Sequence, residues 1–170
     1  ITKAVEANPI EVAPRLAQIE FHLRNKDWKS ALTAARNALA AIPDKPELLD
    51  ALGRTQQISG DSNQALITFG KLASLQPSSP IAQMRMAEIN LANKNKDEAA
   101  KNLRKALEIK PDLLEAQRGL ILLALDSKKP QDALALARDI QKQRPKEATG
   151  FVLEGDINAS SKQWPEAIAA

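Results

Sequence analysis

The sequence predicts an all-α solenoid of antiparallel helix pairs, and two regular columns of residues lead to this prediction. Prolines recur at intervals of 34 residues, at Pro9, Pro43, Pro77, Pro111 and Pro145. Alanines recur at the same interval of 34, at Ala31, Ala65, Ala99, Ala133 and Ala167. Two columns with one period and no slippage indicate an array in which each repeat is one supersecondary unit.

The composition of the 170-residue chain favours helices and excludes several kinds of site. There are no cysteines, which excludes disulfides and thiolate metal ligands, and there is a single histidine, His22. Glycines number only 6, which favours close-packed helices. The most apolar run, residues 119–125, is far shorter than the roughly 18 residues of a membrane span. We therefore expect no catalytic residues, no cofactor, no metal and no transmembrane segment.

Two helices fit within each period, as residues 46–79 illustrate. Pro46 suits the first position of a helix, where its missing N–H group costs nothing. Gly60 and Asp61 then interrupt the helical spacing of the apolar residues, with glycine ending one helix and aspartate capping the next. We expect helix pairs at about 14–25/28–41, 46–59/62–75, 80–93/96–109 and 114–127/130–143, and a fifth pair at 148–161 and from 164 onward.

The repeat frame predicts a single array over residues 1–170. The full repeats are 12–45, 46–79, 80–113 and 114–147, with residues 1–11 as the end of a preceding repeat and 148–170 as a partial one. We expect the chain to be a window of a longer array, whose leader sequence would not be visible. The half helices at the two ends should leave Val5 and Ile168 partly exposed and favour end-to-end contacts between copies.

The alanine column has a physical reason, because small side chains let the two helices of a pair approach closely where they cross. Small residues also occupy the expected facing position in three repeats, as Gly53, Ala87 and Gly155. Ile19 and Ile121 occupy it in the other two. We expect those two helix pairs either to be splayed slightly or to be repacked around the larger residue.

The motif resembles the tetratricopeptide repeat (TPR), a helix–turn–helix unit of 34 residues. Residues 46–79 carry the resemblance best, through Leu52-Gly53, Gly60-Asp61, Ala65, Phe69 and Pro77. The resemblance implies a right-handed superhelical solenoid in which the first helix of each pair lines a concave groove. It also implies a non-catalytic scaffold that binds a protein or peptide.

A narrower resemblance concerns the later repeats. The stretches Leu114-Glu-Ala-Gln-Arg118 and Val152-Leu-Glu-Gly-Asp156 are similar to those of bacterial TPR lipoproteins of the PEP-CTERM/exosortase and exopolysaccharide systems. This resemblance implies a periplasmic or outer-membrane-anchored parent within an envelope, exopolysaccharide or protein-sorting assembly. A cytoplasmic parent is the alternative.

The TPR resemblance, together with helical spacings of three and four residues, predicts which side chains face the groove. The candidate peptide-binding residues are Glu20, Asp50, Arg54, Gln57, Ile81, Met84, Glu88, Leu91, Arg118, Leu122, Leu125, Asp126, Val152 and Asp156. Several are apolar where a merely solvated face would be polar, which favours a binding surface. The alternative is that the apolar residues contact the next repeat.

Charges along the groove predict the chemistry of the partner. Three arginines have an acid three or four residues earlier on the same helix, in the pairs Glu20–Arg24, Asp50–Arg54 and Glu115–Arg118. Four acids have no basic partner on the same helical face, namely Glu47, Glu88, Asp126 and Asp156. The hypothesis is a basic partner segment with apolar anchors, and the alternative is that these acids only keep an open groove soluble.

One subclass of TPR is excluded by the residues themselves. Chaperone-binding TPRs hold a terminal carboxylate with a clamp of Lys, Asn and Arg side chains. The corresponding positions here hold Leu16, Glu20, Ala51 and Ile81, and only Arg85 matches. We therefore predict no such clamp.

Other conspicuous residues have structural interpretations as well as functional ones. His22 could act as a base or ligand, but its place on a first helix favours helix packing. Trp28 and Trp164 occupy the same phase and could contact a ligand, although they also fit the aromatic position at the turn between helices. The lysine-rich segment 94–110 also contains acids, which favours a solvated outer face over an anion site.

The function predicted from the sequence is therefore a protein- or peptide-binding scaffold and not an enzyme. A spacer array with no groove ligand is the first alternative. A helical repeat that binds nucleic acid is a distant one, because the net charge is only +3 and aromatic residues make up only 3% of the chain.

Overall fold

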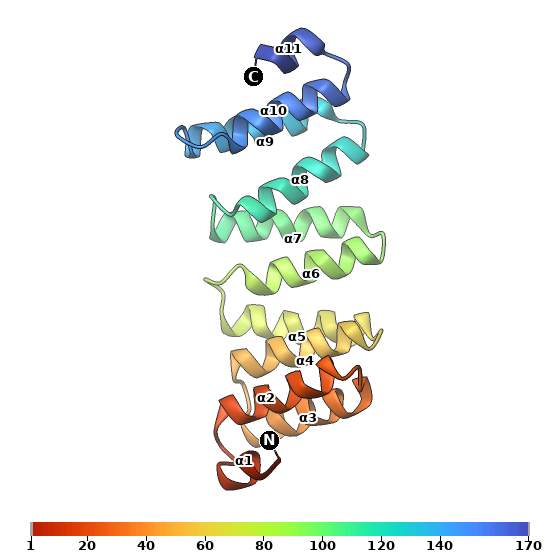
Figure 1. Cartoon of the computed structure of the whole chain (residues 1–170), viewed down its shortest axis with the longest axis vertical. Helices are drawn as coiled ribbons and strands as arrows, with labels where there is room; N and C mark the ends of the chain where they lie inside the picture. Colours follow the sequence, from red (N-terminus) through yellow and green to blue (C-terminus); the bar gives the residue numbers. More distant parts are fainter. Residues whose placement is uncertain (1, 170) are drawn as a thin grey trace. The chain divides into compact units, whose positions relative to one another are not determined.

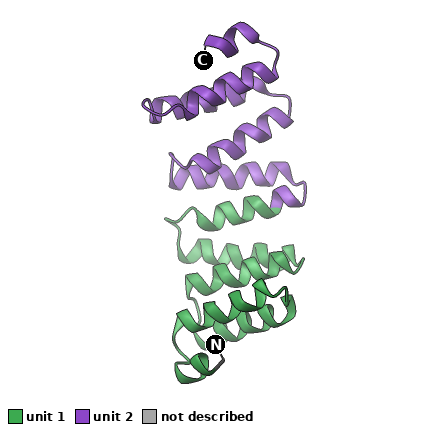
Figure 2. Ribbon diagram, viewed as in Figure 1, with its two compact units in different colours: residues 1–89 green, residues 90–170 purple. Residues whose placement is uncertain are grey.

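The computed structural model describes residues 2–169, and within this range it contains eleven α-helices and no strands (Figure 1). Their bounds are α1 Thr2–Ala7, α2 Val12–Arg24, α3 Trp28–Ala41, α4 Pro46–Ile58, α5 Ser62–Leu75, α6 Ile81–Ala92, α7 Lys96–Ile109, α8 Leu114–Asp126, α9 Pro130–Gln143, α10 Thr149–Ser160 and α11 Trp164–Ala169. The chain divides into two compact units, residues 1–89 and residues 90–170, with the boundary inside α6 (Figure 2).

The predicted helix pairs are confirmed to within two residues at each boundary. Pro46 begins α4, and the Asp61 carboxylate caps α5 by accepting a hydrogen bond from the Gln64 amide at 3.2 Å. Asp27 caps α3 in the same way through the Ser30 amide, and these hydrogen bonds to Ser30 lower the pKa of Asp27. The all-α helical-repeat fold is therefore as the sequence predicts.

The turn between the two helices of each pair has the same backbone conformation in every repeat. Its middle residue has a positive φ in all five pairs, as Lys26, Gly60, Lys94, Lys128 and Lys162. Two residues before the second helix begins, the chain thus adopts the left-handed conformation that glycine tolerates best. The next amide reaches back five residues, for example from Asp61 to the carbonyl of Gln56 at 2.9 Å. Only one of the five turns has glycine at this position.

The turn between successive pairs is tied to the proline column by long side chains. The Arg15 Nε donates a hydrogen bond to the carbonyl oxygen of Pro9 at 2.9 Å, and Arg15 is buried. Gln117, which lies at the equivalent position three repeats later, donates from Nε2 to the carbonyl of Pro111 at 3.2 Å. At two of the five prolines, Pro9 and Pro111, the carbonyl oxygen thus accepts a hydrogen bond from a side chain of the next helix.

Each unit has an apolar core in which the alanine column is buried. Ala31, Ala65, Ala99 and Ala133 are completely buried. The side chain that packs directly against Gly53 is that of Phe69, four residues after Ala65. A Cβ atom at position 53 would lie only 2.6 Å from Phe69 Cζ, so there is no room for a larger residue beside this ring.

The two isoleucines at the crossing are buried in core clusters that also contain a small residue of the second helix. Ile121 lies in one core cluster with Ala137, the residue equivalent to Phe69. Ile19 lies in another with Ala35, which is also equivalent to Phe69. A large residue on the first helix is thus combined with a small one on the second. At the ends, Ile168 is 87% exposed and Val5 is half-buried, as expected.

Candidate functional site

A hollow of about 710 Å³ opens on the face of unit 1 formed by the first helices. Helices α2, α4 and α6 supply most of its walls, and the end of α5 supplies the rest. The residues that line it are Leu16, Ile19, Glu20, Leu23, Arg24, Pro46, Glu47, Asp50, Ala51, Arg54, Ile58, Leu72, Gln76, Ile81 and Arg85.

The walls of the hollow combine a buried apolar floor with half-exposed apolar edges. Ile19, Ala51 and Leu72 are buried and belong to the core beneath it. Ile81 and Ile58 are 50% and 47% exposed. Large apolar side chains left this open beside a concave surface are typical of sites that bind another molecule.

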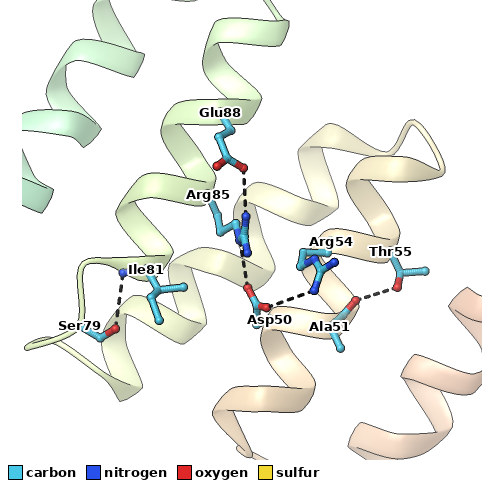
Figure 3. Close-up of polar contacts among 8 residues, drawn as sticks. All are labelled: Asp50, Ala51, Arg54, Thr55, Ser79, Ile81, Arg85 and Glu88. Atoms are coloured by element: carbon cyan, nitrogen blue, oxygen red, sulfur yellow. Dashed lines mark hydrogen bonds and ion pairs between the residues drawn. The ribbon is translucent and has the colours of Figure 1, made fainter. Parts of the chain in front are cut away.

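A chain of charged groups crosses the hollow between α4 and α6 (Figure 3). The Arg85 Nε donates to Asp50 Oδ1 at 3.3 Å, and the Arg85 Nη1 donates to Glu88 Oε2 at 3.3 Å. Arg54 approaches the other oxygen of Asp50 at 4.0 Å. Burial lowers the pKa of Arg85, but the charges and hydrogen bonds of Asp50 and Glu88 outweigh it, so the pKa is raised. Arg85 is therefore a fixed cation between two carboxylates.

The remaining charges of the hollow lie at its edges. Arg24 pairs with Glu20 at 3.2 Å, and both side chains are well exposed. Glu47 lies in the first turn of α4 and is exposed. Within residues 2–169 no ion pair or side-chain hydrogen bond involves Glu47. It is thus an unpaired carboxylate at one end of the hollow.

Four of the predicted groove residues in unit 1 line the hollow, namely Glu20, Asp50, Arg54 and Ile81. Glu88 does not line the hollow but is hydrogen-bonded to Arg85, which does. Gln57 and Met84 are half-buried and do not line the hollow. The sequence interpretation noted Arg85 only as a partial match to a clamp, and it missed the contribution of α5. The close position of Arg85 to Asp50 depends on a contact between residues 35 apart, which helical spacing within one element does not reveal.

The other seven predicted groove residues belong to unit 2. Leu91, Leu122 and Val152 are exposed apolar side chains, with Leu122 at 67%. Leu125 is half-buried and packs against the core cluster around Ile121. Arg118, Asp126 and Asp156 are exposed. Their role in binding stays a prediction.

The predicted charge pattern needs correction at several residues. Glu88, which was expected to have no partner on its own helical face, pairs with Arg85 of the same helix. Asp126 has no such partner but pairs with Lys96 of α7. Within residues 2–169 the expected pair Glu115–Arg118 is not formed. The hollow itself is balanced in charge, because Arg24, Arg54 and Arg85 offset Glu20, Glu47 and Asp50.

The other residues singled out in the sequence, His22, Trp28, Trp164 and the lysines of α7, do not line the hollow. His22 Nδ1 lies 3.7 Å from Asp27 Oδ2, and its ring stands edge-on to Phe21. Trp28 and Trp164 begin α3 and α11, and both are exposed in part. The lysines of α7 are exposed. Residues 2–169 contain no group of three or more His, Cys, Asp and Glu side chains that could hold a metal ion.

Sequence comparison relates part of the chain to a family of repeats. The family model described as SHNi-TPR matches residues 84–117. No curated protein matches the chain. None of the helices within residues 2–169 has the length and apolar character needed to cross a membrane.

Solved structures relate nearly the whole chain to TPR proteins. The MamA protein is 20% identical with a TM-score of 0.71, over 92% of this chain and 86% of that one. YrrB, described as a TPR protein with an unusual peptide-binding site, is 17% identical with a TM-score of 0.66, over 99% and 87%. PilW, described as a type IV pilus biogenesis factor, is 18% identical with a TM-score of 0.74, over 99% and 78%. These similarities confirm the fold and the resemblance to TPR proteins.

Proposed function

We propose that this chain, which has the fold of TPR proteins, is a non-catalytic scaffold that binds a protein or peptide segment in the hollow of unit 1. The observation that carries the proposal is the half-exposed pair Ile58 and Ile81 at the edge of a hollow of about 710 Å³. An apolar concavity with a few fixed polar groups is the usual form of a binding site. The description of YrrB as having a peptide-binding site supports the proposal by similarity of fold.

The main alternative is a spacer array whose hollow binds nothing. The two functions differ in what happens when a charge is placed inside the hollow. Ile81→Asp puts a carboxylate among apolar walls, and a bound apolar side chain would then have to desolvate it. Ile67→Asp is the matched control, because Ile67 is an exposed isoleucine of α5 that does not line the hollow.

The experiment is capture of partners by the purified chain from an envelope fraction of the source cells. We expect Ile81→Asp to lose at least tenfold in the amount of a specific partner, while Ile67→Asp retains it. Photo-crosslinking from position 81 should then identify the bound segment. Equal capture by both variants would support the spacer function instead.

We also propose that the parent protein lies in the periplasm or is anchored to the outer membrane, as part of an envelope, exopolysaccharide or protein-sorting assembly. Two things support this: the similarity of residues 114–118 and 152–156 to bacterial TPR lipoproteins, and a fold shared with a pilus biogenesis factor. Fractionation of the source cells with an antibody to the chain tests the location. Recovery in the cytoplasm alone would contradict it.

Contacts between copies at the chain ends are a further part of the proposal. The strong exposure of Ile168 supports them. Sedimentation at increasing concentration should show association that Ile168→Asp abolishes. A chain that stays monomeric at millimolar concentration would rule them out.

A further inference from the structure

We infer that the segment bound in the hollow carries a cationic side chain and a carboxylate about 10 Å apart, with apolar side chains between them. This inference rests on the proposed function and specifies its partner. The cation is matched to Glu47 and the carboxylate to Arg54.

The four residues of α4 that line the hollow with long side chains lie on one face of the helix. Glu47, Asp50, Arg54 and Ile58 follow one another at intervals of three, four and four residues. Glu47 and Arg54 are two turns apart, which at 1.5 Å per residue is about 10.5 Å along the helix axis. The hollow therefore presents one acid and one base at a fixed separation.

Glu47 is the acid that is free to bind a cation. It is exposed and has no ion pair within residues 2–169, whereas Glu20 is paired with Arg24 and Asp50 with Arg85. Glu47 lies in the first turn of α4. An incoming ammonium or guanidinium group can pair with Glu47 and break no existing contact.

Arg54 is the base that is free to turn toward a carboxylate. Its contact with Asp50 is 4.0 Å long, beyond hydrogen-bond distance, and its side chain is 50% exposed. Arg85 is different, because it is 31% exposed and donates hydrogen bonds to two carboxylates. Figure 3 shows the two arginines on either side of Asp50. Asp50 is held by Arg85, and this leaves Arg54 available for the partner.

Between Glu47 and Arg54 on this face lies Asp50, whose carboxylate is already paired with Arg85, and apolar side chains line the same hollow. Leu16 and Leu23 on α2 and Ala51 on α4 line the hollow together with Ile81 on α6. An extended segment spans about 10 Å in three residues at about 3.3 Å each, and a helical segment spans it in seven. The matching sequences therefore have Lys or Arg and Asp or Glu at i and i+3, or at i and i+7, with Leu, Ile or Val between them.

Synthetic peptides test the inference directly on the whole chain. One probe, Gly-Ser-Lys-Leu-Leu-Glu-Ser-Gly, has the extended spacing, and a second, longer one places Lys and Glu seven residues apart with Leu between. Controls replace both charges by Gln, by two Lys or by two Glu. Because an exposed ion pair contributes about 0.2–1 kcal/mol and the Gln control loses two such pairs, it should bind about two- to thirtyfold more weakly than the better probe. Fluorescence anisotropy at two salt concentrations measures this.

Variants of the chain complete the test. Glu47→Lys should weaken the mixed-charge probe and strengthen the peptide with two Glu. Arg54→Gln should weaken both the mixed-charge probe and the peptide with two Glu, but not the peptide with two Lys. Glu115→Lys is the matched control, since Glu115 occupies the same helical position at the start of α8 and lies outside the hollow. It should change neither affinity.

The outcomes separate this inference from the proposed function. Binding that depends on Ile81 but responds equally to Glu47→Lys and Glu115→Lys would overturn the inference and leave the scaffold function intact. Peptide binding that Ile81→Asp does not affect would overturn both. Circular dichroism of each variant confirms that the helices are retained.

Discussion

The helix pair α4–α5 in unit 1 and the pair α8–α9 in unit 2 have the same lengths but distribute volume differently. The first helices both have 13 residues and the second helices both have 14. Where the helices cross, Gly53 faces Phe69 in one pair, while Ile121 occupies a cluster with Ala137 in the other. The large side chain at the crossing therefore comes from the second helix in one pair and from the first helix in the other.

The same comparison separates residues that make the fold from residues that make the site. Completely buried alanines and left-handed turns recur in both pairs. The groove face differs, because the position of Arg54 in α4 is occupied by the exposed Leu122 in α8. A periodic fold thus leaves the outward positions free to differ from repeat to repeat.

The largest expected effect comes from exchanging the crossing residues in α4–α5. Phe69→Ala should lower the free energy of unfolding by about 3–5 kcal/mol, because it leaves a cavity. Adding Gly53→Ile recreates the arrangement of Ile121 with Ala137 and should recover at least about 1 kcal/mol. Gly53→Ile alone should be destabilising, since its side chain would clash with Phe69. Urea unfolding of the four proteins measures this, and strictly additive effects would refute volume exchange.

The alanine column gives the next largest effect. Ala65→Leu or Ala99→Leu should overpack the crossing and cost about 1–3 kcal/mol in unfolding free energy. Lys101→Leu, on the exposed face of α7, should cost less than about 0.5 kcal/mol. Thermal and urea unfolding give both values. Equal costs at the buried and exposed positions would show that the helices are turned differently.

A smaller effect sharpens the comparison within unit 2, where Glu154 of α10 occupies the position of Leu120 in α8. The hydrogen bond from Gln141, at 2.6 Å, lowers the pKa of Glu154, and burial opposes this shift. Because the folded pKa lies below the ordinary value of 4.5, the contribution to stability is present above that value and is lost as the pH falls through the folded pKa.

Replacing Glu154 by Gln should therefore lower stability by about 1 kcal/mol at pH 7 and have less effect near pH 3. Urea unfolding between pH 7 and pH 3 gives the comparison with the wild-type chain. Glu115→Gln is a control on an exposed carboxylate. A deficit for Glu154→Gln that grows toward low pH would contradict the assignment.

The smallest effect concerns the turns, which use glycine once and lysine four times. Lys128→Gly should raise the free energy of unfolding by about 0.5–1 kcal/mol, because glycine adopts a positive φ more readily. Gly60→Lys should lower it by a similar amount. Thermal unfolding of both variants measures the shifts. A loss of stability in Lys128→Gly would show that the lysine side chain contributes a contact of its own.

The sequence predicted the fold well because its periodic residues act within one repeat. A proline, an alanine or a left-handed turn has the same neighbours in each period, so phase alone defines the helices. The site was predicted in part, because the TPR resemblance and helical spacing together placed Asp50 and Arg54 on the face that lines the hollow. The partners of Glu88 and Asp126 were missed, because the direction of a side chain and its contacts with other helices decide which charges meet. The same holds for Leu72 and Gln76, which reach the hollow from the end of a second helix.

The exchange of volume at the helix crossing has a consequence for how such a gene can be rearranged. Recombination between the α4–α5 and α8–α9 repeats at the turn inside a pair would join the first helix that carries Ile121 to the second helix that carries Phe69. The two large side chains would then overfill the crossing. The reciprocal product would join glycine to alanine and leave a void. A joint at the proline turn between pairs keeps every crossing matched. Duplications that survive should therefore begin and end at the prolines.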